Sequence, residues 1–152
     1  MSTLVLELRQ GDLMVVNGAS IRFRNRARVE LPVRARFLFG KQVMAPEAAN
    51  TPARRVYFAL QAAYVGPEEE REPAMARAHA LAAELQAATT SAMVQVLLDR
   101  ALVLAEAEDW YAALKLVRRV MAHEASVLGL DLATGLPPGA AGTAAQGTGI
   151  AL

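Results

Sequence analysis

The sequence predicts an α+β protein in which a small antiparallel β-sheet comes first and about four α-helices follow. Apolar and polar residues alternate with a period of two as far as about residue 45, which is typical of strands. From Pro46 onward the apolar residues recur at helical spacing. The last 24 residues contain six glycines, two prolines and no basic residue. We therefore expect a basic antiparallel β domain over residues 1–45, a helical domain over 46–128 and a disordered tail over 129–152.

Two turn signals divide the β region into short strands. The segment Arg9–Asp12 separates the apolar runs "TLVLEL" and "LMVVNG", and Asn17-Gly18 ends the second run. Between residues 20 and 31 the odd positions are mostly apolar. A three-residue loop over Asn25–Ala27, or one long strand, would place the even positions on one face. That face would carry Arg22, Arg24, Arg26 and Arg28.

Capping residues predict where the helices begin and end. Thr51-Pro52 combines an N-cap with proline at the first helical position, and Gly66-Pro67 separates this helix from the next. A third helix is expected from about Ser91 to Glu106, and a fourth from Asp109 to Gly129. The third helix is apolar nearly all round, so we expect it to be buried in a bundle or against a partner.

Composition limits the class of protein. The chain has 152 residues, of which 54% are apolar and 20% charged, which is enough for a folded core. It contains no cysteine, which excludes disulfides, thiolate metal sites and cysteine nucleophiles. No apolar run is long enough to cross a membrane, and Glu7 and Arg9 stand where a signal peptide would be apolar. We expect a cytoplasmic protein without membrane contact.

The net charge of +1 conceals a strong asymmetry. Residues 1–55 hold ten lysines and arginines against four acids, a net charge of +6, whereas residues 56–152 hold six against eleven, a net charge of −5. Like charges on neighbouring strands repel, so an exposed sheet face normally mixes both signs. The arginine-rich face therefore predicts a polyanionic partner, and the alternative is an ordinary solvated sheet face.

Arg54 and Arg55 extend this prediction to the first turn of a helix. The free N–H groups and the helix dipole already make that turn positive, so two arginines there indicate a phosphate site. Alternatively, one arginine reaches back to Glu47 and the other is solvated. Phe37 and Phe39 are candidates for stacking on unpaired bases, with core packing as the alternative. The predicted RNA-binding residues are Arg9, Arg22, Arg24, Arg26, Arg28, Arg34, Arg36, Lys41, Arg54 and Arg55.

No stretch of the sequence has the pattern of a catalytic site. A glycine-rich phosphate loop, a nucleophile elbow and a dinucleotide-binding fingerprint are all missing from the sequence. His79 and His123 are far apart in the chain and lack the spacing of metal ligands. We therefore expect a protein that is not an enzyme and that needs no cofactor or metal.

Three segments carry a resemblance to a known family: "STLVLELRQGDLMVVNG", "RARFLFGKQVMAPEAANTPARRVYFALQAAYVG" and "ALKLVRRVMAHE". They closely resemble the flagellum biosynthesis repressor family FlbT over residues 1–128. The resemblance implies a post-transcriptional repressor of flagellin synthesis and flagellum biogenesis, which binds the 5′ untranslated region of flagellin mRNA and promotes degradation of that mRNA. It also implies a functional link with the regulator FlaF and with flagellin.

A second likeness concerns the β region alone. "LVLELRQGDLMVVNG" is similar to the opening strands of the carbon-storage regulator CsrA, a small RNA-binding β protein. Leu8 and Ala53 stand where that family has RNA-contacting arginines, so the likeness implies a related sheet with different contacts. The alternative function is a protein-interaction module or chaperone-like adaptor that binds flagellin or FlaF, with indirect effects on mRNA. The apolar helical region also makes a homodimer a candidate assembly.

Overall fold

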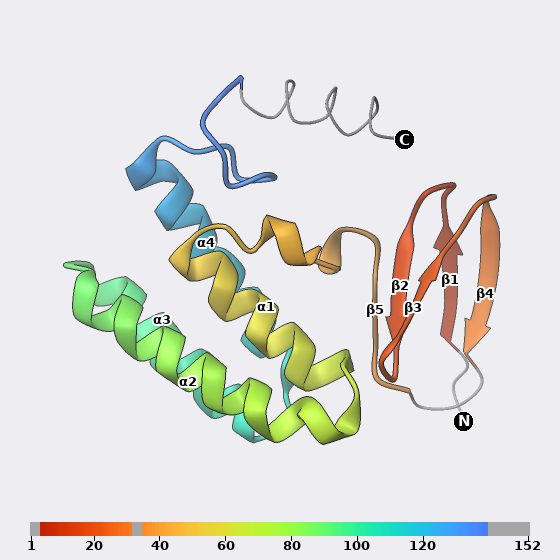
Figure 1. Ribbon diagram of the computed structural model, residues 1–152, viewed down its shortest axis with the longest axis horizontal. Coiled ribbons are helices and arrows are strands. Elements are labelled where there is room, and N and C mark those ends of the chain that lie inside the picture. The colour runs from red at the N-terminus through yellow and green to blue at the C-terminus, as the bar shows by residue number, and fades with distance from the viewer. Residues whose placement is uncertain (1–3, 32–34, 140–152) are drawn as a thin grey trace.

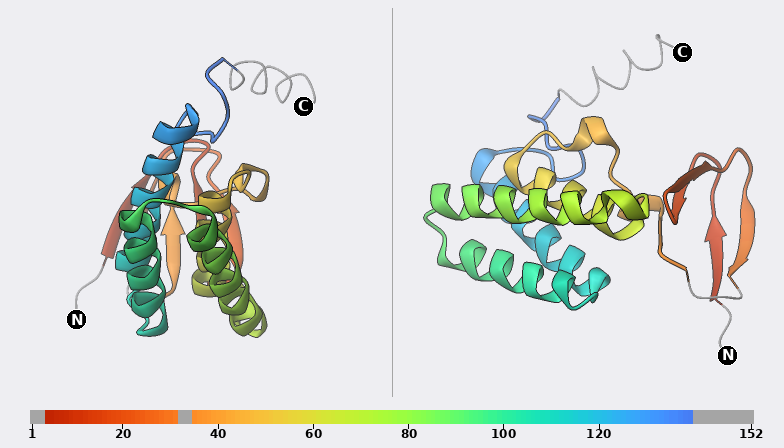
Figure 2. Two further views of the ribbon diagram at one scale, coloured as in Figure 1. Left: turned by 90° about the vertical axis from the view of Figure 1, so that its left-hand side faces the viewer. Right: turned by 60° about the horizontal axis from the view of Figure 1, so that its bottom comes forward.

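The computed structural model describes residues 4–31 and 35–139, and it consists of a small β-sandwich followed by four helices (Figure 1). The predicted α+β class and the order of its parts are confirmed. Both figures show the helices on one side of the sandwich (Figure 2), and Figure 1 shows strand β5 (Phe37–Phe39) next to them and β4 (Ala27–Leu31) farthest away. Among the described residues, no helix combines the length and the apolar character needed to cross a membrane.

The expected single sheet is divided into two. Strands β1 (Leu4–Leu8) and β4 (Ala27–Leu31) pair antiparallel, with Leu6 opposite Val29. The other sheet has the order β3-β2-β5, and all its pairs are antiparallel. Its strands are β2 (Leu13–Val16), β3 (Ala19–Arg22) and β5 (Phe37–Phe39).

A separate apolar core fills the space between the two sheets. Leu6, Leu8 and Met14 are buried there, and Phe37 and Phe39 are among the half-buried residues packed against them. The alternation of buried and exposed positions along β1 is the period-two pattern expected of a sheet with one face covered. Both phenylalanines therefore pack in the sandwich core, as the alternative to base stacking predicted.

Two single-turn 3₁₀ helices, Gly40–Gln42 and Pro46–Ala48, connect the sandwich to the bundle. Gln61 of the first long helix holds this connection by two hydrogen bonds to the backbone of Met44, one accepted from its N–H (2.8 Å) and one donated to its carbonyl (2.9 Å). Gln61 is buried, so both bonds are shielded from water. The connection is thus fixed to the helices.

The helices begin at the predicted caps. Helix α1 (Pro52–Val65) follows Thr51, whose hydroxyl accepts from the N–H of Arg54 (3.2 Å). Helix α3 (Ala92–Glu106) follows Ser91, whose hydroxyl accepts from the N–H of Val94 (3.2 Å). Helix α2 (Arg71–Ala88) is preceded by a 3₁₀ turn over Glu68–Glu70, and helix α4 (Trp110–Leu128) ends at Gly129, which has a φ of 67°.

The four helices pack in two antiparallel pairs, α1 with α2 and α3 with α4, and α1 also packs along α4. One continuous core runs through them, with Leu60, Leu98 and Val117 fully buried. Helix α3 buries only one side. Its outer side leaves Met93, Val96 and Val103 exposed by 45%, 63% and 67%.

The chain after α4 folds back against the start of α1. The N–H of Leu130 bonds the carbonyl of Ala125, and the side chain of Asn50 donates to the carbonyl of Thr134 (3.0 Å). The composition placed the start of a disordered tail at residue 129, but residues 130–136 form a turn held by these hydrogen bonds. The rest of the expected tail, residues 140–152, lies outside the described residues.

Candidate nucleic-acid interface

The sandwich tip is the end of the β-sandwich where loops 9–12 and 23–26 lie side by side, at the top of the sandwich in Figure 1. The N–H of Gly11 bonds the carbonyl of Phe23 (2.6 Å), and the N–H of Phe23 bonds the carbonyl of Asp12 (2.9 Å). Gly11 has a φ of 88°, a backbone conformation that favours glycine. The two loops, each of which joins one sheet to the other, therefore form one surface.

Five arginines gather at the tip or immediately below it. Arg24 and Arg26 lie in loop 23–26 and Arg9 lies in loop 9–12, whereas Arg22 and Arg28 lie in the strands on either side of loop 23–26. All five side chains are exposed, and none of them takes part in an ion pair of the described chain. The carboxylates nearest in the fold are that of Asp12, which accepts from the backbone N–H of Arg9 (2.9 Å), and that of Glu7. The five are Arg9, Arg22, Arg24, Arg26 and Arg28.

The prediction that these arginines share one face of a ribbon is wrong. Strand β3 pairs with β2 and not with β4, so Arg22 and Arg28 belong to different sheets. Arg22 is directly opposite Leu13, on the sheet face that also carries Leu38 and looks toward the helices. Arg28 is opposite Glu7 on the outer face of the other sheet. What brings them together is the end of the sandwich, where both strands meet the same loop.

Arg54 has a structural position. Its side chain is only 5% exposed, and its three guanidinium nitrogens donate to the carbonyls of Ala48 (2.6 Å), Leu132 (3.0 Å) and Ala133 (3.2 Å). Burial lowers the pKa of this guanidinium, and the carboxylates of Glu124 and Asp131 act in the opposite direction. The alternative contact with Glu47 is not observed, because each nitrogen donates to a backbone carbonyl and the side chain is held inside the protein.

The other predicted residues are dispersed. Arg55 and Lys41 are exposed, the first on helix α1 and the second just after strand β5. Arg36 is turned away from the tip and pairs with Glu108. Arg34 lies outside the described residues. At the two positions compared with CsrA, Leu8 and Ala53 are completely buried, so neither position can touch RNA.

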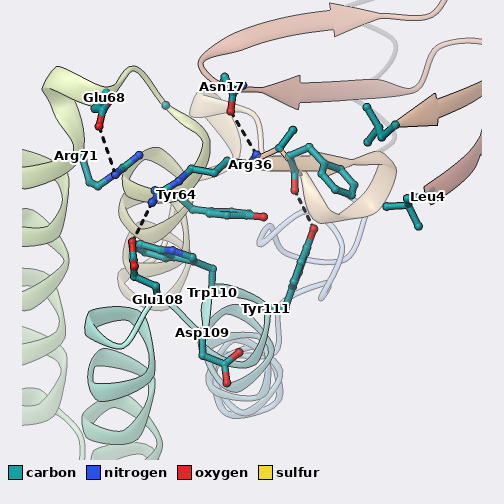
Figure 3. A pocket seen from close by; sticks show the side chains of 14 residues that line it. Leu4, Asn17, Arg36, Tyr64, Glu68, Arg71, Glu108, Asp109, Trp110 and Tyr111 are labelled. Carbon is teal, nitrogen blue, oxygen red and sulfur yellow. Dashed lines mark hydrogen bonds and ion pairs between the residues drawn. The ribbon is translucent and has the colours of Figure 1, made fainter. Parts of the chain in front are cut away.

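A cleft of about 1100 Å³ lies between the sandwich and the helices, on the side away from the tip (Figure 3). Arg36 crosses it, bonded to Glu108 (3.0 Å) and with its guanidinium carbon 6.0 Å from the ring centre of Trp110. Tyr64 stacks on Trp110 with ring centres 5.5 Å apart. The hydroxyl of Tyr111 donates to the carbonyl of Phe37 (3.1 Å). These contacts join the sandwich to the bundle.

The polar groups of the cleft argue against a phosphate ligand. The charged residues that line the cleft are three acids, Glu68, Glu108 and Asp109, and two bases, Arg36 and Arg71. Burial raises the pKa of Tyr111 well above its usual range, and the neighbouring Tyr64 acts in the same direction, so the phenol stays protonated. A polyanion approaching this cleft would meet three carboxylates, and the basic tip is therefore the better nucleic-acid surface.

Sequence reasoning missed a second group of basic residues, on helix α4. Lys115 and Arg119 are exposed and Arg118 is half-buried. A nitrogen of Arg118 donates both to the carbonyl of Lys41 (2.9 Å) and to the hydroxyl of Tyr57 (3.0 Å). The available signal was the charge pattern, because helix α4 has no acid before Glu124.

Comparisons with known proteins all point to one family. A family model described as "Flagellar protein FlbT" matches residues 4–128. A "Probable flagellum biosynthesis repressor protein FlbT" of Brucella anthropi is 32% identical over 131 residues, covering 83% of this chain and 82% of that protein. No solved structure matches the chain.

Shorter alignments join two further proteins with the same printed name. The Chelativorans protein is 37% identical over 67 residues, which is 44% of this chain and 46% of that protein. The Allorhizobium ampelinum protein is 35% identical over 71 residues, which is 47% of this chain and 48% of that protein. The aligned part of the chain thus spans about half the length of these two relatives.

Proposed function

The chain belongs to the FlbT family of flagellar proteins, and we propose that it represses flagellum biosynthesis by binding the 5′ untranslated region of flagellin mRNA through the sandwich tip. The names of its relatives support a repressor of flagellum biosynthesis. The observation that supports the mode of action is the gathering of five exposed arginines at the tip, where the two loops that join the sheets meet.

The chemistry of the tip suits the backbone of an RNA chain. Guanidinium groups donate two parallel hydrogen bonds to phosphate oxygens, and they keep their charge at any physiological pH. Arg24 and Arg26 make no hydrogen bond or ion pair among the described residues, so their donors are free for a ligand. Their mutual repulsion is relieved when phosphates lie between them.

The tip offers no exposed aromatic side chain for stacking on bases. Phe23, Phe37 and Phe39 pack in the sandwich core. Binding through phosphates alone is insensitive to base sequence, so recognition of a particular leader would rest on RNA shape. We also propose that the chain binds without catalysis, so a ribonuclease carries out the degradation of the bound mRNA.

The test is a salt titration of the binding of a flagellin leader RNA. The double variant Arg24→Ala/Arg26→Ala should lower the slope of log affinity against log salt by about 1.4, since each lost single-strand phosphate contact accounts for about 0.7. Arg77→Ala/Arg100→Ala, which removes two exposed arginines of α2 and α3, serves as the matched control. Equal slopes for the tip variant, the control and the wild type would refute the proposal.

A second candidate function rests on the outer side of helix α3. Met93, Val96 and Val103 form an exposed apolar stripe there. It would serve the adaptor alternative, in which the bundle binds flagellin or FlaF. In that case Val96→Asp/Val103→Asp should abolish co-purification with flagellin, whereas Ala83→Asp on the exposed side of α2 should not. Unchanged co-purification with flagellin, and with FlaF in the same assay, would eliminate this candidate.

A further inference from the structure

Helix α4 carries the only dense group of basic residues in the described part of an otherwise acidic helical region. Between Trp110 and His123 it has Lys115, Arg118 and Arg119 and no acid. Their spacing of three and four residues places them on one side of the helix. Residues 56–152 as a whole hold six basic residues against eleven acids, so this helix departs from the charge of its surroundings.

Arg118 is held in a fixed position, and some of its N–H donors are not used by the hydrogen bonds that hold it. Its guanidinium carbon lies 5.4 Å from the ring centre of Tyr57, and the nitrogen Nη2 bonds the carbonyl of Lys41 and the Tyr57 hydroxyl. That hydroxyl in turn donates to the carbonyl of Gln42 (2.6 Å). No hydrogen bond among the described residues uses Nε or Nη1. A guanidinium fixed in this way loses little entropy when it binds an anion.

A cavity of about 240 Å³ lies beside these donors. Arg118, Lys115, Tyr57 and Gln42 are among the residues that line it. Since one water molecule occupies about 30 Å³ of liquid, the cavity has room for a group of phosphate size. It is an open depression on the surface, so a phosphate of a polymer can enter while its neighbours stay outside.

The basic side of α4 is continuous with the sandwich tip. Strand pairing sets Arg22 opposite Leu13 and Met14 opposite Phe39, so the chain leaves β5 at the end of the sheet that carries Arg22. Neighbouring strands are about 4.8 Å apart, which places the start of the connection about two strand spacings from Arg22. Lys41 comes directly after that point, and Arg118 bonds its carbonyl.

We propose that RNA bound at the sandwich tip continues past Lys41 onto helix α4, where Lys115, Arg118 and Arg119 hold further backbone phosphates. This inference rests on the proposed RNA binding and adds a second contact surface on the helical domain. A chain of phosphates suits this arrangement because Lys41 lies between the tip side of the sheet and Arg118, and an RNA backbone presents its charges at regular intervals.

The experiment compares salt titrations of flagellin leader RNA for four proteins: the wild type, Lys115→Ala/Arg119→Ala, the tip variant Arg24→Ala/Arg26→Ala, and the control Arg77→Ala/Arg100→Ala. Lys115 and Arg119 are exposed, so the α4 variant should fold as the wild type does by circular dichroism. Its slope should fall by about 1.4, with an equal further fall when it is combined with the tip variant.

The possible results separate the two proposals. If the α4 variant matches the control while the tip variant loses affinity, the second surface does not exist and the proposed function stands. If the wild type binds no RNA, both proposals fall. If the α4 variant keeps full RNA affinity but loses binding to purified flagellin, the basic side of α4 is a protein-binding surface and the inference is overturned.

Discussion

The sandwich tip and the start of helix α1 use the same residue type in opposite ways. At the tip, Arg24 and Arg26 extend from an exposed loop and none of the ion pairs of the described chain involves them. At the start of α1, Arg54 is buried and binds three backbone carbonyls, one just before the helix and two in the distant segment after α4. A basic segment of sequence can therefore supply both ligand-binding and structural cations. Only the burial of each side chain and its hydrogen-bond partners distinguish the two kinds.

The buried arginine should give the largest loss of stability. Arg54→Ala leaves the carbonyls of Ala48, Leu132 and Ala133 without their donor, and hydrogen bonds to a charged group contribute about 1.5 to 3 kcal/mol each. We expect the free energy of unfolding in urea to fall by about 3 kcal/mol, within the range of severe single substitutions. Its exposed neighbour Arg55 provides the control. Arg55→Ala should change the free energy of unfolding by less than about 0.5 kcal/mol.

RNA binding by the same variant provides a second test of the structural role of Arg54. Arg54→Ala protein that remains folded at low temperature should bind leader RNA as tightly as the wild type. A large loss of RNA affinity with unchanged stability would mean that Arg54 is a ligand-binding residue after all.

Gly135 tests the same contact from the other side. Its φ of 69° favours glycine, and a Cβ there would lie 2.6 Å from Cδ of Arg54 and also overlap Asn50. Gly135→Ala should therefore destabilise the protein by about 2 kcal/mol through backbone strain and displacement of Arg54. Gly139→Ala, where φ is 92° but nothing lies near the added carbon, isolates the strain alone. Equal unfolding midpoints for the two variants would show that the contact with Arg54 is unimportant.

Arg36 is intermediate between the two environments. Its ion pair with Glu108 involves a carboxylate side chain that is 67% exposed, so water screens most of the attraction. The contact between the Arg36 guanidinium and the ring of Trp110 adds further stabilisation. We expect Arg36→Ala to cost about 1 kcal/mol of unfolding free energy. A double-mutant cycle with Glu108→Ala should assign less than half of this to the ion pair, and a larger share would contradict the role given to Trp110.

The tip arginines should give the smallest effect on stability. Arg24→Ala/Arg26→Ala removes no hydrogen bond of the described chain, and it relieves repulsion between like charges, so the unfolding free energy should change by less than about 0.5 kcal/mol. A stabilisation that disappears at high salt would confirm the repulsion. Marked destabilisation would place these side chains in the fold and not in a ligand site.

Local signals in the sequence predicted most of the helical region. Thr51, Ser91 and Gly129 stand at the helix ends because caps act within a few residues, and the structure has all three. Strand pairing acts over longer distances. Alternation correctly separated Val29, which faces the sandwich core, from Arg28 on the outer face of β4, but it could not show that β3 pairs with β2 and β4 with β1.

The same limit explains the site predictions. That Arg54 is buried depends on Leu132 and Ala133, which are 78 and 79 residues away along the chain. Nothing near Arg54 in the sequence shows those carbonyls. The basic side of α4 differs, since it has a local signal: three basic residues at helical spacing with no acid among them.

The bonds from Arg54 to Leu132 and Ala133 also set an order of events during synthesis. All five strands precede residue 40, so the β-sandwich is complete in the nascent chain long before α1 can receive its final contacts. A ribosome adding about 5 to 20 residues per second needs roughly 4 to 16 seconds to cover the 78 residues from Arg54 to Leu132. During that interval the arginine-bearing loops already exist, while the helical region still lacks the segment that closes it.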